Sequence, residues 1–182
     1  MRAEVSAVAF RLFTEQGFDR TTVDQIATEA GLSRATFFRY FRTKEDVVLG
    51  DLEDLGHDIA RRLSERPVDE RPWDSLRCAL AVLGEFNADE PEKALAYVRM
   101  FCETPSLKAR RWEKQQAWQD LLVPEVSRRL GIDPAAVDDP RAHALVASAL
   151  ACKDAATDAW TACNGTIPLT ALIDRAMEAL TA

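Results

Sequence analysis

The amino-acid sequence predicts an all-α protein, and three observations support this fold class. Apolar residues recur at intervals of three and four in every long segment, which is the pattern of a helix with one buried face. Proline and glycine fall near the ends of these segments, where they begin or end helices. No segment shows the alternation of apolar and polar residues that is typical of a strand, and no internal repeat is present. At 182 residues, the chain is long enough for one domain, or for a small domain joined to a larger one.

The first two helices are expected near the N-terminus. Residues 3–16 form the first, and Gly17 is placed to end it. Its expected buried face consists of Val5, Ala9, Leu12 and Phe13. A second helix follows Thr22, which is a good N-cap and has Gln25 three residues later, as a capping box requires. The apolar face of this helix consists of Val23, Ile26, Ala27 and Ala30.

A glycine turn leads from the second helix to the third. Gly31 suits this turn because a left-handed conformation costs little without a Cβ atom. Ser33 is expected to cap a third helix over residues 34–40, and Thr43 is expected to cap a fourth. Lys44 stands in the first turn of the fourth helix, where the helix dipole favours carboxylates. A phosphate partner would explain a lysine at this position.

Two short helices joined by a glycine turn, with basic residues along the second, form a helix-turn-helix. For an isolated match, the simpler alternative is a helical hairpin that binds nothing. Here the match is long and ordered, and from about Val5 to Leu49 the sequence resembles the TetR family of transcriptional regulators. The residues that carry the resemblance are Phe13, Gly17, Phe18, Thr22, Ile26, Ala27, Ala30, Gly31, Ser33, Thr36, Phe37, Tyr40, Phe41 and Lys44.

The resemblance implies that the third helix lies in the major groove of double-stranded DNA. By position it places Arg34, Ala35 and Phe38 nearest the bases. The residues that it places nearest the phosphates are Thr22, Thr36, Arg39, Tyr40 and Lys44. Arginine pairs with guanine in a bidentate manner, while hydroxyl groups and lysine bind phosphate oxygens. Phe38 departs from the usual tyrosine of the family, which leaves an apolar contact such as one with a thymine methyl group.

Two further expectations concern the residues around the motif. Phe37 and Phe41 are assigned to the core of the small domain. Only Met1 and Arg2 precede the first helix, where the family usually carries a basic arm, so no minor-groove contact from an arm is expected.

The net charge of −7 is unevenly distributed along the chain. Residues 1–46 carry seven basic and seven acidic side chains, whereas residues 47–182 carry 16 basic and 23 acidic ones. Arg34, Arg39, Arg42 and Lys44 follow one another without an intervening acid. This asymmetry fits a DNA-binding domain over residues 1–46 and an acidic domain over residues 47–182 that the duplex repels.

The acidic domain is expected to be helical throughout. The helix that begins near Lys44 is expected to end near Glu65, and its Gly50 and Gly56 indicate either close packing or a compliant connection between the domains. Residues 65–72, with two prolines, form a linker. Further helices are expected over residues 72–88, from Pro91 onwards, over 105–130 with a kink or break at Pro124, over 141–164 and over 168–180.

Members of the TetR family commonly hold a ligand pocket in the acidic domain, and the resemblance implies one here. The candidate lining residues are Phe86, Tyr97, Met100, Phe101, Trp112, Gln116 and Trp118, although the same side chains would also serve in an ordinary core. The domain is similar to actinobacterial members thought to respond to fatty acyl thioesters. This similarity points to an apolar or amphipathic effector such as a fatty acyl-CoA. Arg110, Arg111 and Lys114 then either meet a CoA phosphate or form a solvated basic face.

A symmetric homodimer is expected through the last two helices. The final helix has an apolar stripe formed by Leu169, Leu172, Ile173, Ala176, Met177 and Leu180. In the helix before it, Ala147, Ala151, Ala155 and Ala159 recur at every fourth position, which allows close approach of helix axes. A dimer of this kind would bind a two-fold symmetric operator. The expected function is that of a repressor that its effector releases from DNA.

Two other functional classes are alternatives to this one. An enzyme would need a base beside a nucleophile or a metal cluster, and the sequence offers only Asp154 and Asp158 one turn apart as a carboxylate pair. A DNA-binding dimer whose acidic domain binds no small molecule is the other alternative. The four cysteines and two histidines are too widely spaced to indicate a metal or another cofactor. With no apolar run of membrane length and no signal-peptide pattern, a cytoplasmic protein without membrane contact is expected.

Overall fold

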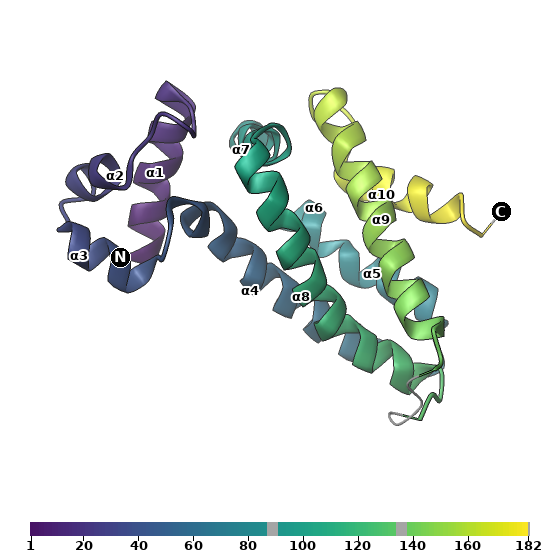
Figure 1. Ribbon diagram of the computed structural model, residues 1–182. Helices are drawn as coiled ribbons and strands as arrows, with labels where there is room; N and C mark the ends of the chain where they lie inside the picture. Colours follow the sequence, from purple (N-terminus) through teal and green to yellow (C-terminus); the bar gives the residue numbers. More distant parts are fainter. Residues whose placement is uncertain (87–90, 134–137, 182) are drawn as a thin grey trace.

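The computed structural model describes residues 1–86, 91–133 and 138–181, without the side chains of residues 49–51, 86, 109–112 and 114. Every regular element in these residues is a helix, so the all-α prediction is confirmed (Figure 1). The helices are α1 (Arg2–Gln16), α2 (Val23–Glu29), α3 (Arg34–Tyr40), α4 (Lys44–Ser64), α5 (Pro72–Leu80), α6 (Val82–Phe86), α7 (Pro91–Glu103), α8 (Pro105–Arg129), α9 (Arg141–Ala162) and α10 (Leu169–Glu178). Within the described part of the chain, none of them is long and apolar enough to cross a membrane.

Helices α1 to α3 form a small head at one end of the molecule, and α4 leads from it into the larger body (Figure 1). The capping residues and the turn glycine of the head adopt the conformations predicted from the sequence. The Thr22 side chain accepts a hydrogen bond from the Gln25 backbone in a complete capping box, and Gly31 adopts a φ of 67°. Ser33 caps α3, and Thr43 caps α4 in a second capping box with Asp46.

The predicted helix over residues 72–88 is wrong in its length, because the chain turns at Ala81 and divides it into α5 and α6. The Ala81 amide donates to the Cys78 carbonyl, and the Gly84 amide donates to the Ala81 carbonyl, which tightens the backbone here. A Cβ atom on Gly84 would lie 2.4 Å from the Thr170 Cγ2 atom of α10. The turn therefore brings α6 against α10 at a position where a Cβ atom would force the Thr170 side chain to move.

Of the kink or break expected at Pro124, the break is wrong, since α8 continues through this residue without interruption. Proline removes the amide hydrogen bond to the carbonyl four residues earlier, which belongs to Asp120. Both Pro124 and Asp120 are exposed, so water can satisfy the freed carbonyl group. The helix therefore tolerates the proline because it lies on the solvent side.

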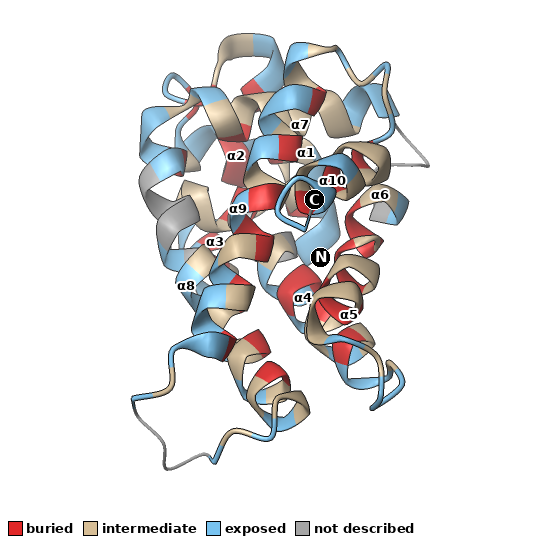
Figure 2. Cartoon of the chain, turned by 90° about the vertical axis from the view of Figure 1, so that its right-hand side faces the viewer, coloured by how far each residue is buried: buried red, intermediate tan, exposed pale blue. Residues whose placement is uncertain are grey.

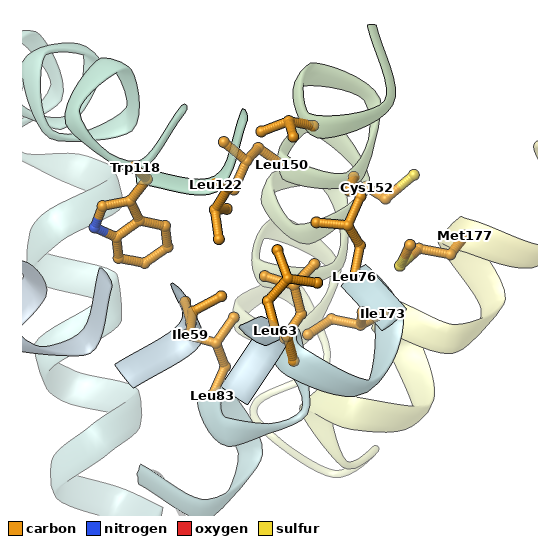
Figure 3. Packing of buried hydrophobic residues seen from close by; sticks show 14 of the residues in the cluster. Ile59, Leu63, Leu76, Leu83, Trp118, Leu122, Leu150, Cys152, Ile173 and Met177 are labelled. Carbon is orange, nitrogen blue, oxygen red and sulfur yellow. The ribbon is translucent and has the colours of Figure 1, made fainter. Parts of the chain in front are cut away.

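The body core lies between α4, α5, α8, α9 and α10. Figure 3 shows how it is assembled, with Ile59 and Leu63 of α4 close to Leu122 of α8, and Ile173 of α10 approaching from the other side. In α10, Leu169, Ile173 and Met177 are buried at intervals of four residues. Leu172 and Ala176 are only partly buried, and Leu180 is 60% exposed. One body therefore covers only half of the apolar stripe on the last helix.

A second buried cluster fills the head and extends into the body. Its members from the head include Phe13, Ile26 and Phe37, together with Phe41 as predicted. Phe101 of α7 and the fully buried Leu107 of α8 belong to the same cluster. The head core is therefore closed by side chains from the body.

Candidate functional site

Helix α3 presents three of its side chains to solvent on the outer surface of the head. Arg34 and Ala35 are exposed in its first turn, directly after the Ser33 cap, and Phe38 follows one turn later. Phe37 is completely buried and holds the opposite face of the helix in the head core. The residues predicted to meet DNA bases thus lie together on one free face of a short, firmly packed helix.

Phe38 is 42% exposed, which is unusual for a phenylalanine. Its ring packs edge-on against Phe37 with 5.6 Å between ring centroids. On its other side the Arg34 guanidinium lies 5.6 Å from the ring centroid. An apolar ring beside a basic group on an outer face is suited to meet a thymine methyl group next to a guanine edge.

Arg34 is held by an acidic residue of α2 that the sequence analysis did not single out. Its Nη1 atom donates to the Asp24 Oδ2 atom at 3.1 Å, and both side chains remain more than 60% exposed. Because the pair is so exposed, it is weak and can be exchanged for a base contact. Ten residues separate the two side chains, and only the angle between α2 and α3 brings them together.

The predicted phosphate-binding residues surround this face. Thr22 is exposed at the start of α2, where its hydroxyl donates to the Gln25 side chain at 3.2 Å. Thr36 shares a hydroxyl hydrogen bond with Ser33 at 2.9 Å. The exposed Arg39 lies over the ring of Tyr40, 5.2 Å from its centroid, and Tyr40 packs partly on the head core. Their contacts with phosphate stay a prediction.

Lys44 has contacts within the head that the sequence did not indicate. Its ammonium donates to the backbone carbonyls of Phe18 at 2.8 Å, Thr21 at 3.2 Å and Asp19 at 3.4 Å. It also lies 4.4 Å from the centroid of the Phe18 ring. These contacts explain a lysine in the first turn of α4 without any phosphate, because the side chain fastens α4 to the loop between α1 and α2. A contact with DNA would add to this role.

Several head carboxylates are bound within the head, which leaves basic groups to set the local charge. Arg11 of α1 binds Glu29 at 2.8 Å and Glu15 at 3.4 Å. The Asp46 side chain accepts from the amides of Arg42 and Thr43 at the start of α4. Helix α3 itself carries Arg34 and Arg39 and no acidic residue, and Arg34 is paired with Asp24 of α2.

The seven candidate effector residues do not converge on one site among the described side chains. Tyr97, Met100 and Phe101 pack on the head cluster, whereas Trp118 lies in the body core. Gln116 is exposed and donates to Gln119 at 3.4 Å. The side chains of Phe86 and Trp112 lie outside the described residues, as do those of Arg110, Arg111 and Lys114.

Trp118 is fixed by a close approach between α8 and α4. Its indole nitrogen donates to the Leu52 carbonyl at 2.9 Å, and a Cβ atom on Gly56 would lie 2.4 Å from that nitrogen. The close-packing explanation of Gly56 is therefore confirmed. Lys153 of α9 lies on the other side of the indole, 5.3 Å from the ring centroid.

The pair Asp154 and Asp158 has no features of a catalytic site. Asp154 binds the ammonium of Lys153 at 2.5 Å, whereas Asp158 is exposed and lies 4.0 Å from the Cys102 Sγ atom. Lys153 is only 13% exposed, and its ammonium also lies over the ring of Trp118 in α8.

Comparison with known proteins agrees with this arrangement. Residues 6–50 match the family model described as bacterial regulatory proteins of the tetR family, and residues 70–182 match that of the MftR C-terminal domain. The mycofactocin biosynthesis transcriptional regulator MftR of Mycobacterium tuberculosis is 32% identical over 134 residues, which cover 70% of this chain and 64% of that protein. The HTH-type transcriptional regulator TcmR of Streptomyces glaucescens is 32% identical over 152 residues, covering 80% and 66%. The chain thus spans slightly less than two thirds of the length of either relative.

Among solved structures, the fold is similar to that of Thermus thermophilus FadR, a transcriptional repressor in complex with lauroyl-CoA. The TM-score is 0.62 at 24% sequence identity, and the match covers 100% of this chain and 93% of that one. These proteins are transcriptional regulators and not enzymes. The two family models together cover the head and most of the body, and the chain therefore belongs to the TetR family of transcriptional regulators, with a C-terminal domain of the MftR type.

Proposed function

We propose that this protein is a repressor that binds a two-fold symmetric operator as a homodimer and leaves it when an apolar or amphipathic effector binds the body. The exposed face of α3, with Arg34, Ala35 and Phe38 side by side, is the observation that carries the DNA-binding part. A helix of this size enters the major groove, and its first residues read base edges.

Dimerisation is supported by the outer faces of α9 and α10. All four alanines of the predicted stripe, Ala147, Ala151, Ala155 and Ala159, are exposed. Leu172, Ala176 and Leu180 of α10 are likewise left partly or fully uncovered. Figure 2 views the molecule from the side on which these two helices lie. A two-fold axis would pack both helices of each subunit into a four-helix bundle.

The DNA-binding proposal is tested by selecting bound sequences from random duplexes with the purified chain. The expected result is a palindromic consensus whose affinity falls steeply with salt concentration, because phosphate contacts release counterions. A pool that shows no preference after several rounds would refute the regulator proposal.

The effector part rests on the family and on the FadR structure that holds lauroyl-CoA. Titration of the operator complex with fatty acyl-CoA of increasing chain length tests it, and release of DNA is the expected outcome. The scattered positions of the candidate lining residues favour the alternative, a DNA-binding dimer without a small ligand. If no acyl-CoA or other lipophilic compound raises the melting temperature or releases DNA, that alternative stands.

A further inference from the structure

A hollow of about 290 Å³ lies at the junction of head and body, away from the exposed face of α3. We call it the seam hollow. Helix α1 forms one wall, α7 forms the facing wall, and the first turns of α4 lie between them. In Figure 1, α1 and α7 lie on either side of the point where α4 leaves the head. Its lining residues are Ala3, Ser6, Ala7, Phe10, Phe13, Val47, Val48, Lys93, Ala94 and Tyr97.

The hollow exists because small side chains face one another across the seam. Ala3 and Ala7 lie on an exposed strip of α1, and Ala94 lies on α7. The base is apolar and well packed, with Val47 and Val48 each only 3% exposed. Water binds weakly in an apolar recess of this kind, because it finds few polar partners there.

Two aromatic rings define the shape of the recess. The rings of Phe10 and Tyr97 lie 5.8 Å apart between centroids, tilted by 35°. The Tyr97 hydroxyl donates to the Val48 carbonyl of α4, so its ring is fixed in place as part of the wall. The contact also joins α7 directly to the helix that leads into the head. A planar molecule entering the hollow would meet rings and methyl groups.

We propose that the seam hollow is a binding site for a small, mainly apolar aromatic molecule of one or two rings, separate from the effector site in the body. A dry cavity of roughly 150 Å³ in another protein takes up benzene, and about 300 Å³ is the lower end of ligand pockets. The volume of the seam hollow therefore suits one or two rings. Lys93 and Ser6 are the charged and the hydroxyl-bearing members of the lining, but most of the lining is apolar, so rings and methyl groups would form most of the contacts with the ligand.

The position of the site gives it a consequence for the head. Its walls belong to α1 and α7, so a ring that fills the hollow contacts both helices. Such a ligand favours the arrangement of head and body in which the walls are closed on it. This inference goes beyond the proposed function, and it does not depend on the operator or on the body effector.

Binding of 2-naphthol and of indole to the purified full chain, without DNA, tests the site. Both probes are expected to bind saturably in ligand-detected NMR and to show contacts with valine and alanine methyl groups. Ala7→Leu places three more carbon atoms in the hollow from an exposed position, and it should weaken binding about tenfold or more. Ala3→Leu serves as a second variant from the same exposed strip, should the first one lower the helix content seen by circular dichroism.

The matched control is Ala117→Leu on α8. Ala117 is also exposed and lines a second hollow of about 290 Å³, formed with Glu53, His57, Trp118, Asp120 and Leu121. This variant should bind both probes as the unmodified chain does. Hydrogen exchange gives an independent readout, in which the probe should protect amides of both α1 and α7.

Three results would overturn the proposal. One is that neither probe binds the unmodified chain. Another is that Ala117→Leu weakens binding while Ala7→Leu and Ala3→Leu do not. The last is protection confined to a single one of the two walls. Failure of operator selection would leave all of these measurements in place, so the two proposals can fail separately.

Discussion

Arg34 and Lys44 are both basic residues of the head, yet their surroundings give them different roles. Arg34 is exposed, pairs with the equally exposed Asp24 and lies beside the ring of Phe38. Lys44 is partly buried and donates to three carbonyl groups of one loop. The first side chain is therefore available for recognition, whereas the second stabilises the structure that presents it.

Replacing Arg34 with alanine should relax the preference at one base position of each half-site. A good bidentate contact with guanine contributes about 1–3 kcal/mol of discrimination, and that amount should be lost. Competition binding between the consensus and single-base variants measures the effect. Arg11→Ala is the control, since Arg11 binds Glu15 and Glu29 and should leave the preference unchanged. Equal losses at all positions would contradict a base contact by Arg34.

Replacing Lys44 with methionine should lower the stability of the head. The substitution keeps the apolar stem but leaves the carbonyls of Phe18, Asp19 and Thr21 without this donor, at a cost of about 1–3 kcal/mol. Thermal unfolding and amide exchange in α1 and α2 report it. Arg42→Met changes an exposed side chain and should not alter stability. An unchanged melting temperature for Lys44→Met would show that the loop does not depend on the ammonium.

At the scale of helices, glycine and arginine fix the approach of α8 to α4. Gly56 gives room to the indole of Trp118, as described above. At the C-terminal end of α8, the side chain of Arg129 is fully buried, and its guanidinium donates to the carbonyls of Leu63, Arg66 and Pro67. Together these contacts hold the two helices along most of their length.

Gly56→Ala should destabilise the protein although alanine favours helix by about 1 kcal/mol. The new Cβ atom would displace Trp118 and break its hydrogen bond to Leu52, with an expected net cost of about 1–3 kcal/mol. Denaturant unfolding of the single variants and of a double variant with Trp118→Phe measures the coupling. Additive effects would mean that the glycine and the indole do not constrain each other.

The loop between α4 and α5 makes stability depend on pH. Two hydrogen bonds from Arg66, and one from Ser75, lower the pKa of Glu70 to about 2 from its ordinary value of 4.5. A depressed carboxyl pKa contributes stability that is complete above the unfolded pKa and is lost as pH falls from about 4.5 to about 2. Glu70→Gln should therefore cost about 1–3 kcal/mol at pH 7 and much less at pH 3.

Urea unfolding of the unmodified chain and of Glu70→Gln at both pH values checks this dependence. Glu92→Gln is a suitable control, because Glu92 is exposed on α7. A difference between the unmodified chain and Glu70→Gln that is the same at pH 7 and pH 3 would rule out the ionised carboxylate as the cause.

At the scale of the whole molecule, DNA binding is proposed to depend on the homodimer. One half-site gives few contacts, so affinity requires two heads on one operator. Leu172→Asp places a carboxylate on the partly covered face of α10, and it should give a folded monomer that no longer binds the operator. Sedimentation velocity and operator binding measure both effects.

Val68→Asp is the matched control for the dimer. Val68 is 68% exposed in the loop between α4 and α5, away from α9 and α10. Its replacement should change neither sedimentation nor DNA binding. A monomeric unmodified chain at micromolar concentration would exclude the proposed interface.

The sequence by itself determined the helices, their caps and the DNA-binding motif. The helix caps join residues that are only three positions apart, namely Thr22 with Gln25 and Ser33 with Thr36. Gly31 likewise forms its turn locally. Such local interactions can be predicted from the spacing of residues alone. The buried face of α1 also agreed with its apolar period, because a helix on a surface buries one stripe. The residues on the exposed face of α3 were instead named through the resemblance to the TetR family.

Only the tertiary structure decided which partner each side chain meets across the molecule. Tyr97 and Phe101 were expected to line a pocket in the body, yet both belong to the cluster that fills the head, and Tyr97 lines the seam hollow. The division of the predicted helix at Ala81 and the continuity of α8 through Pro124 depend on which neighbours and which solvent lie outside each helix. Such contacts join residues tens of positions apart, and no local spacing encodes the angle at which two helices cross.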